Sequence, residues 1–490
     1  MEWVIANMAP LMFGALVVFL LFGYPVAFSL AANGILFGLI GIELGLLTPA
    51  LFQALPERIF GIMANDTLLA IPFFTFMGLV LERSGMAEDL LDTIGQLFGP
   101  MRGGLAYAVI FVGALLAATT GVVAASVISM GLISLPIMLR YGYDKRLATG
   151  IIAASGTLAQ IIPPSLVLII MADQLGRSVG DMYEGAIIPG MLLSGMYVGY
   201  VVILSILKPS TCPALPPEAR TIHGVKLAIR VVTTMIPPLM LIFLVLGTIF
   251  MGIATPTEGG AMGATGALVL ALARRRLSFK LLKQAMETTG KLSSFVIFIL
   301  VGSTVFGLIF RAVNGDLWVE HLLLSLPGGQ AGFLIVVNVM VFFLAFFLDF
   351  FELSFIIVPL LAPVADKLGI DLVWFGILLA VNMQTSFMHP PFGFALFYLR
   401  SVAPPSIKTT DIYWGAIPFV CIQIIMVSII IIFPGVVSYG DPAEQARIQM
   451  QKDGTAPALD LGAMLQESNA EEKAEKDNAA DMLKQLQGAK

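Results

Sequence analysis

Charged residues are what this sequence has least of. Only 12% of its 490 residues are charged and 58% are hydrophobic, whereas a soluble domain carries about 25% charged residues. Two cysteines, Cys212 and Cys421, are too few for a disulfide framework or a cysteine-based metal site. No GxxxxGK[ST] phosphate loop occurs, so ATP hydrolysis is not expected. A net charge of −5 gives no reason to expect a nucleic-acid partner. These absences exclude a soluble globular enzyme and favour an integral membrane protein.

Long uncharged runs are what the sequence has instead. They cover residues 3–42, 103–139, 147–172, 185–207, 231–257, 292–310, 322–348, 372–399 and 412–440. Several exceed the roughly 20 residues that a helix needs to cross hydrocarbon. Alternation with a period of two, which a barrel would need, is absent. The N-terminus has no basic region before its first apolar run, so we expect that run to be a membrane helix and not a cleaved signal. The fold class predicted is an all-α integral membrane protein.

An internal repeat divides the chain. A polar interval at 208–226 separates two hydrophobic halves, predicted as a first repeat at 1–207 and a second at 227–439, with a polar C-terminal tail at 440–490. At an offset of 227, residues of the first half match residues of the same type in the second: Pro136 and Pro363, Gly142 and Gly369, Asp144 and Asp371, Pro163 and Pro390, Pro164 and Pro391. "DMYEGAI" at 181–187 matches "DIYWGAI" at 411–417 at an offset of 230. The two halves are therefore predicted to share one fold.

One apolar segment in each half is too long for a single crossing. Residues 103–139 contain "ATTGVVAAS" near their middle, and residues 322–365 contain "LDFFEL". We expect each to be a re-entrant hairpin, which leaves five crossings per half and about ten in all. An odd number of crossings per half inserts the repeats with opposite orientation, an arrangement typical of secondary transporters.

Paired prolines interrupt two further apolar runs. Successive prolines leave backbone carbonyls without helical partners, and in hydrocarbon such carbonyls need protein, water or an ion. Small polar residues precede both breaks: Ser155, Gly156, Thr157 and Gln160 in the first half, and Asn382, Gln384, Thr385 and Ser386 in the second. Oxygen ligands of this kind suit sodium. The alternative is a pair of kinks that only let helices pack.

The expected hairpin tips carry further candidates. Thr119, Thr120 and Gly121 interrupt the first hairpin, and glycine there permits close approach. Asp349 and Glu352 lie in the second, where ionisable residues at membrane depth are functional candidates. The alternative is that both acids reach the membrane surface and are solvated.

Two residues after the second break are candidates for contact with a solute. His389 could contact or protonate substrate, or be a structural imidazole. Arg400 could clamp a carboxylate, or anchor a helix at the membrane edge.

The sequence resembles the large membrane subunit of tripartite ATP-independent periplasmic (TRAP) transporters, the DctM-like family. The resemblance covers about residues 5–435 and rests on "YGYDKRLATGIIAASGTLAQIIPPS", "GAIIPG", "GIATPTEGGAMGA" and "FLDFFELSFIIVPLLAPVADKLGID" running to "MHPPFGFALF". It implies an elevator-type, sodium-coupled importer of organic acids in the bacterial inner membrane. It also implies two partners, a small four-helix membrane subunit (DctQ-like) and a periplasmic solute-binding protein (DctP-like). Closer similarity to a subgroup whose relatives include 2-oxo acid systems suggests carboxylates of that kind.

Carried over by position, the resemblance places sodium around Thr119, Thr120 and Gly121 with Ser155 and Gly156, and around Asp349 with Asn382 and Thr385. The solute-binding candidates are Thr120, Gln160, Glu352, Gln384, His389 and Arg400. Two passages depart from the family pattern, since "TTGVVAAS" is more apolar than the usual serine-rich first hairpin and "LDFFEL" lacks a proline after its aspartate.

Two other functions stay open at this point. One is a stand-alone carboxylate or ion transporter, coupled to sodium or to protons through Asp349, Glu352 or His389. The other is an intramembrane enzyme, because Asp349 and Glu352 lie three residues apart on one helical face. Against the enzyme, the sequence has no nucleophile-and-base motif and no metal-ligand cluster.

Overall fold

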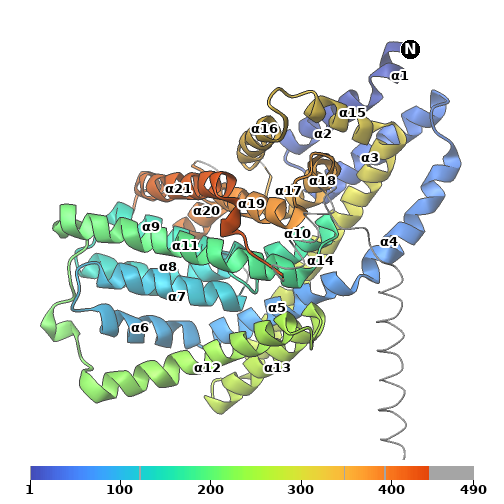
Figure 1. The fold of residues 1–490 in the computed structure, drawn as a ribbon. Helices are drawn as coiled ribbons and strands as arrows, with labels where there is room; N and C mark the ends of the chain where they lie inside the picture. Colours follow the sequence, from blue (N-terminus) through green and yellow to red (C-terminus); the bar gives the residue numbers. More distant parts are fainter. Residues whose placement is uncertain (1, 121–122, 347, 391–392, 441–490) are drawn as a thin grey trace, which may run out of the picture. The chain divides into compact units, whose positions relative to one another are not determined.

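The structure is a computed structural model that describes residues 2–120, 123–346, 348–390 and 393–440. Every regular element in this described part is helical (Figure 1). The α-helices are α1 (Glu2–Ala6), α2 (Met8–Leu21), α3 (Val26–Glu43), α4 (Leu55–Met63), α5 (Asp66–Arg83), α6 (Met86–Phe98), α7 (Gly104–Thr120), α8 (Val123–Arg140), α9 (Lys145–Thr157), α10 (Leu166–Leu175), α11 (Val179–Leu207), α12 (Gly224–Phe250), α13 (Pro256–Ala273), α14 (Phe279–Ala312), α15 (Gly315–Leu324), α16 (Gly329–Leu344), α17 (Phe350–Ile356), α18 (Val358–Lys367), α19 (Leu372–Gln384), α20 (Phe394–Val402) and α21 (Thr409–Ile432). Short 3₁₀ helices are η1 (Pro49–Ala54), η2 (Leu158–Gln160), η3 (Pro209–Thr211), η4 (Pro217–Ala219), η5 (Thr385–Phe387) and η6 (Pro434–Val436).

Six helices in the described residues are long and apolar enough to cross a membrane: α3, α8, α11, α12, α14 and α21. Two bent pairs raise the number to eight if each is one span, namely η1–α4 with α5, bent by 46°, and α15 with α16, bent by 117°. The all-helical membrane class is therefore confirmed for the described part of the chain. The expected ten crossings stay a prediction.

One set of helices packs together through small residues and is called the frame below: α3, α5, α12, α13 and α14. In α13, a Cβ on Gly263 would lie 2.5 Å from the sulfur of Met77 in α5. Between α3 and α14, a Cβ on Gly302 would lie 2.4 Å from the carbonyl oxygen of Ala27. Glycine at these points lets the helix backbones approach closely, as in other membrane helix pairs.

A second set of helices is called the core below: α7–α11 and α16–α21, with η2 and η5 between them. The boundaries of some of these helices repeat along the chain. Helix α19 starts 227 residues after the start of α9 and ends 227 residues after its end, and the same offset relates η5 to η2. Asp144 and Asp371 cap the starts of α9 and α19 by accepting backbone N–H groups. Gly142 and Gly369, two residues earlier, both have positive φ, at 81° and 73°. Equivalent sequence signals therefore produce equivalent helix starts.

The two halves of the core interleave. Helix α9 of the first half packs on α21 of the second, and α20 packs on α8 (Figure 1). At the crossing of α9 and α21, a Cβ on Gly150 would lie 2.0 Å from the carbonyl oxygen of Gly415. These helices touch backbone to backbone, so no larger residue fits at that crossing.

The segment expected to form the second hairpin, residues 322–365, spans several helices. Residues 322–324 belong to α15, and α16 starts at Gly329. The apolar run continues through this region, but Gly328 and Gly329 both have positive φ and turn the chain between the two helices. The segment expected to form the first hairpin, residues 103–139, contains α7 and α8, and residues 121–122 between them lie outside the described residues. The names first and second hairpin are kept for these two segments, while their entry and return on one side of the membrane stays a prediction.

The polar linker at 208–226 is fastened to the first half. Backbone N–H groups of Gly103 and Asp144 donate to the carbonyls of Cys212 and Thr211, each at 2.9 Å. Helix α11 ends at Leu207 as expected, and α12 begins at Gly224. The tail at 441–490 lies outside the described residues.

Helix α6 connects the frame to the first hairpin. Its buried apolar side packs on α7. Its Asp89 pairs with Arg274 at 3.5 Å and Arg276 at 3.1 Å, and its Asp92 pairs with Arg230 at 2.7 Å. Helix α6 therefore contacts the frame side through ion pairs and the core through apolar packing.

Candidate functional site

Both proline-interrupted helices end in the same way. After α9 the chain forms η2, leaves helical geometry, and starts again at α10; after α19 it forms η5 and starts again at α20. Ser165 closes the first break, because its hydroxyl donates to the carbonyl of Gln160 at 2.6 Å and accepts from the N–H of Val167 at 3.2 Å. At the second break, the N–H of Gly393 donates to the carbonyl of His389 at 2.6 Å.

The two breaks meet at equivalent residues. The side-chain amide of Gln384 donates to the hydroxyl of Thr157 at 3.1 Å, and these residues are 227 positions apart. Thr157 in turn donates to the carbonyl of Ala154 at 2.8 Å. Both side chains are fully buried. Residues at equivalent positions of the two halves are therefore in direct contact. The side-chain oxygen of Gln384 has no partner among the described residues, and the expected contact of Gln384 with the solute stays a prediction.

Ser155 occupies the first expected sodium position. It is fully buried, and its hydroxyl oxygen has no hydrogen-bond partner among the described residues. A Cβ on Gly113 in α7 would lie only 2.6 Å from the Cβ of Ser155, so α7 presses against this residue. Gly156 is equally crowded, since a Cβ there would lie 2.3 Å from Val127. Thr119 and Thr120 are the last two residues of α7. Gly121 lies outside the described residues.

Asn382, the equivalent of Ser155, occupies the second expected sodium position. Its side-chain amide donates to the backbone carbonyl of Asn338 at 2.8 Å and to the side-chain oxygen of Asn338 at 3.0 Å. Thr385 donates its hydroxyl to the carbonyl of Asn382 at 2.6 Å. Sequence reasoning missed Asn338. Its signal is a single amide inside the apolar stretch "FLIVVNVMVFFL".

Asp349 and Glu352 form a capping box at the start of α17. The Asp349 side chain accepts the N–H of Glu352 at 3.0 Å, and the Glu352 side chain accepts the N–H of Asp349 at 2.9 Å. This reciprocal arrangement satisfies two backbone donors that a helix start leaves free. Glu352 is buried. The two carboxylates therefore act together to begin the helix at the tip of the second hairpin.

A cavity of about 250 Å³ lies where the breaks, the second hairpin tip and the frame come together. Its described lining comprises Val123, Ala124, Gln160, Leu166, Val167, Leu292, Phe295, Asp349, Phe350, Phe351, Phe387, Phe394 and Tyr398. Leu292 and Phe295 come from α14 of the frame, and every other lining residue comes from the core. The cavity is thus bounded by both groups of helices.

Four helix starts converge on this cavity. The first residues of α8, α10, α17 and α20 are all in its lining. A helix start carries free N–H groups and about half a positive charge, and such starts bind anions without a basic side chain. Gln160 also lines the cavity; it is 1% exposed and its side-chain oxygen has no partner among the described residues. The start of α17 is already capped by the carboxylates of Asp349 and Glu352, so the starts of α8, α10 and α20 are the ones that can hold an anion.

The other two expected solute residues lie elsewhere. His389 is buried between the rings of Phe342 and Phe346, with centroids 4.1 Å and 4.4 Å away, and neither ring nitrogen has a partner among the described residues. Arg400 is exposed and donates to the carbonyl of Ile407 at 2.6 Å. Neither these two residues nor Glu352 and Gln384 are among the described residues that line the cavity.

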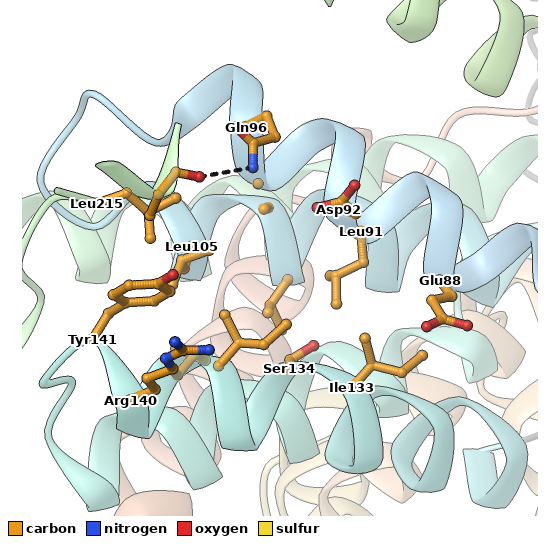
Figure 2. A pocket seen from close by; sticks show the side chains of 16 residues that line it. Glu88, Leu91, Asp92, Gln96, Leu105, Ile133, Ser134, Arg140, Tyr141 and Leu215 are labelled. Atoms are coloured by element: carbon orange, nitrogen blue, oxygen red, sulfur yellow. Dashed lines mark hydrogen bonds between the residues drawn. The ribbon is translucent and has the colours of Figure 1, made fainter. Parts of the chain in front are cut away.

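A second cavity, of about 330 Å³, separates α6 from the first hairpin. Figure 2 shows it between α6 and α8, with Arg140 and Tyr141 at one end and Glu88 at the other. At its rim the side-chain amide of Gln96 donates to the carbonyl of Ala219 in the linker at 3.2 Å. The sequence did not single out any of these residues. The cavity contains charges of both signs and lies at the joint between α6 and the core.

Comparison with known proteins gives consistent results. A profile of the family described as "Tripartite ATP-independent periplasmic transporter, DctM component" matches residues 13–436. The C4-dicarboxylate TRAP transporter large permease protein DctM of Pseudomonas aeruginosa is 30% identical over 394 residues, which cover 80% of this chain and 90% of that protein. The protein of the same name from Vibrio cholerae is 30% identical over 448 residues, covering 87% and 96%. Among solved structures, the YdaH transporter of Alcanivorax borkumensis has a similar fold, with a TM-score of 0.53, 16% identity, and coverage of 79% of this chain and 88% of that one.

Proposed function

Because the chain belongs to the DctM component family of tripartite ATP-independent periplasmic transporters, we propose that it imports an organic acid by coupling to sodium. It is a membrane protein and a transporter permease by family. The finer proposal is that the chain lies in the bacterial inner membrane and that the acid binds in the cavity at the starts of α8, α10 and α20. That convergence of helix starts is the observation that carries the proposal.

Sodium is the proposed coupling ion because the residues beside the cavity offer oxygen and little else. Ser155 and Gly156 with the end of α7 would form one site, and Asn382 and Thr385 with Asp349 the other. The unpartnered hydroxyl of Ser155 supports the first site, since a buried polar atom without a partner is costly. The amide nitrogen of Asn382 holds two oxygens of Asn338, at 2.8 Å and 3.0 Å, and this supply of oxygen beside Asn382 supports the second. Sodium at these sites would fix the helix ends that face the anion.

Transport is proposed to follow an elevator mechanism, in which the core moves across the membrane against the frame. The cavity has α14 of the frame as one wall, so movement of the core past α14 would open it to one side or the other. A ligand shifts such an equilibrium only if it binds the two states differently. Sodium supplies this difference by ordering the breaks before the acid binds.

Two partners follow from the proposed function. A tripartite transporter needs a small membrane subunit, DctQ-like, and a periplasmic solute-binding protein, DctP-like, beside this component. The binding protein would deliver the acid, and the small subunit would pack on the frame in the lipid bilayer.

Uptake in proteoliposomes tests the proposal. The complex of the permease with its small subunit is reconstituted, and uptake of the acid bound by its binding protein is followed with and without an inward sodium gradient. Uptake is expected only when the sodium gradient and the binding protein are both present. Equal uptake when choline replaces sodium would refute the coupling to sodium. Uptake driven by a proton gradient without the binding protein would indicate a stand-alone transporter instead.

A further inference from the structure

A smaller pocket, of about 130 Å³, lies between the core and α14. Its core side consists of Gln174 at the end of α10 and of residues from the end of α17 and the start of α18. Its other side is the last part of α14, together with Arg58 of α4, which packs on α14. The hydroxyl of Ser303 in α14 donates to the carbonyl of Phe355 in α17 at 2.6 Å. The pocket therefore lies on the seam between frame and core, as the cavity at the helix starts does.

Three helices connect this pocket with the cavity at the helix starts. Helices α10, α14 and α17 each line both spaces. In α10, Val167 lines the cavity and Gln174 lines the pocket, and a rise of about 1.5 Å per residue puts them about 10 Å apart along the helix. In α14, Phe295 and Ser303 have the same roles, about 12 Å apart. The two spaces thus follow one another along the same seam.

Two guanidinium groups line the pocket without an acid beside them. Arg58 and Arg311 are both in its lining, and none of its described lining residues is aspartate or glutamate. No ion pair between described residues involves either arginine. Two acids adjoin lining residues in the sequence: Glu57 is exposed, and Asp173 is already held by two side-chain amides at 2.6 Å and 2.8 Å. In the described part of the chain, both guanidinium groups are therefore free to bind an anion.

The pocket recognises charge and little else. Guanidinium groups bind carboxylates through pairs of parallel N–H donors. The hydroxyl groups in the lining are engaged elsewhere, since Ser303 donates to Phe355 and Thr304 donates to the carbonyl of Leu300 at 2.8 Å. A cavity of about 150 Å³ holds benzene, so the pocket is large enough for a carboxylate on a short carbon chain. Nothing in its described lining selects one carbon skeleton closely.

The arginines lie toward the end of α14 that the positive-inside rule places outside the cytoplasm. Basic residues 274–276 precede the start of α14, and Lys280 lies in its first turn. The rule places such a basic segment at the cytoplasm. Arg311 is in the last turn of the same helix. The pocket is therefore nearer to the side from which an importer takes up its solute.

We propose that Arg58 and Arg311 form an entry site, which binds the carboxylate of the incoming acid before the acid moves along the seam to the cavity at the helix starts. The inference rests on the proposed function, because it adds a first binding step to the same import. Binding at the entry site needs the arginines and not sodium, since no residue of the two proposed sodium sites is in the described lining of the pocket.

A reporter thiol in the pocket tests its charge. Gly307 lines the pocket, and a Cβ there meets nothing within 4 Å, so Gly307→Cys has room. It is made in a Cys212→Ser, Cys421→Ser background of the permease in complex with its small subunit, in phosphatidylcholine vesicles. Methanethiosulfonates that carry a sulfonate or a trimethylammonium group modify the thiol, and each rate is divided by the rate of that reagent with 2-mercaptoethanol. The normalised rate should be about fivefold or more higher for the sulfonate, because the two guanidinium charges attract it.

A matched set of variants ties this preference to the arginine pair. Arg58→Gln and Arg311→Gln should each lower the ratio of the two rates, and the double variant should bring it to within about twofold of one. Arg177→Gln is the control, because Arg177 is exposed just after α10 and is not in the described lining. It should leave the ratio unchanged within twofold. Raising the salt from about 0.15 M to about 1 M should weaken the preference, since the screening length falls from about 8 Å to about 3 Å.

Protection of the same thiol tests the ligand. Succinate is the probe, as a C4-dicarboxylate of the kind named for two similar permeases, and uncharged succinamide is its control. At ten times its half-protecting concentration, succinate should slow alkylation by N-ethylmaleimide about tenfold, equally in sodium and in choline. Succinamide should leave the rate within twofold. The double arginine variant should raise the half-protecting concentration roughly tenfold or more, the value of a charge-assisted contact.

The outcomes separate the entry site from the function on which it rests. An anionic lipid headgroup offers the same chemistry, so protection by phosphatidylglycerol in the vesicles without protection by succinate overturns the entry role. Absence of a preference for the sulfonate reagent also overturns it, as does an effect of Arg177→Gln equal to that of Arg311→Gln. Protection by succinate that requires sodium would place the acid in the cavity instead and overturn it too. Sodium-independent uptake, in contrast, refutes the proposed function and leaves the anion site standing.

Discussion

Gly113 gives a direct way to disturb the first proposed sodium site without touching its ligands. It lies in α7, and a Cβ at this position would come within 2.6 Å of the Cβ of Ser155 and 3.1 Å of its carbonyl oxygen. Carbon atoms prefer separations of about 3.5–4.0 Å. Gly113→Ala therefore requires Ser155, or α7, to move by about 1 Å.

The size of the effect follows from that movement. Adding one methyl group to a well-packed interior costs about 1–3 kcal/mol. Ser155 can relax into the space of the absent ion when sodium is not bound, so most of the strain falls on the sodium-bound state. At about 1.4 kcal/mol per factor of ten, sodium affinity should fall roughly 5- to 150-fold.

Thermal unfolding of the purified complex at increasing sodium concentration measures this affinity. Bound sodium stabilises the folded protein, by about 2.7 kcal/mol at one hundred times Kd, and the concentration dependence of the midpoint gives the Kd. Gly195→Ala in α11 is the control, because a Cβ there meets nothing within 4 Å. It should keep the sodium dependence of the wild type and gain up to about 1 kcal/mol from helix propensity.

The reasoning would be refuted if Gly113→Ala shifted the sodium dependence by less than twofold in a folded protein. It would also be refuted if Gly195→Ala shifted that dependence as much as Gly113→Ala does. If Gly113→Ala lowered the unfolding midpoint equally at every sodium concentration, the strain would be present in both the sodium-bound and the sodium-free protein. That result would contradict the placement of Ser155 in the sodium site.

Three further predictions concern other contacts. Asp349→Asn should leave the start of α17 intact, because asparagine caps helices as well as aspartate does. It should reduce sodium-dependent uptake roughly tenfold or more, the value of one charge-assisted contact. A lowered unfolding midpoint together with normal uptake would contradict this prediction. Thr157→Val should destabilise the protein by about 1–3 kcal/mol, because it leaves the buried amide of Gln384 without its acceptor, and adding Gln384→Leu should recover part of that loss in a double-mutant cycle. Asp89→Asn should lower stability by only about 0.2–1 kcal/mol for each partly exposed ion pair lost, and raising the ionic strength should reduce the difference from wild type in thermal unfolding.

The helical breaks were well predicted from sequence because proline acts locally. A proline pair removes backbone donors wherever the rest of the chain lies, and the breaks follow Thr157 and Gln384 in the structure. The sequence showed Asp144 and Asp371 only as a matching pair, and the structure adds that both cap helix starts. The match in role follows because a helix cap depends on the next three residues only. The DctM resemblance, carried by these same motifs, is confirmed by the match over residues 13–436.

The surroundings of the candidate residues could not be predicted in the same way. Asn338 became visible only where α16 meets α19, 44 residues away in sequence. Arg400 and His389 were candidates for contact with a solute, and that contact stays a prediction. Only the structure shows that Arg400 donates to a nearby loop and that His389 lies between two phenylalanine rings. Such contacts depend on which helices cross, and a single sequence gives no direct signal of a crossing.

The sequence by itself determined the helical membrane class, the two broken helices and the matching residue pattern around them, since each depends on composition or on local backbone chemistry. Only the tertiary structure decided that four helix starts share one cavity with an aromatic wall, half of which comes from the second hairpin tip and the frame. It also decided that Thr157 meets Gln384 across 227 residues. The physical reason is the same in both cases: side-chain burial and hydrogen bonding between distant segments are settled by close packing of the helices, down to backbone contact at Gly150 and Gly415.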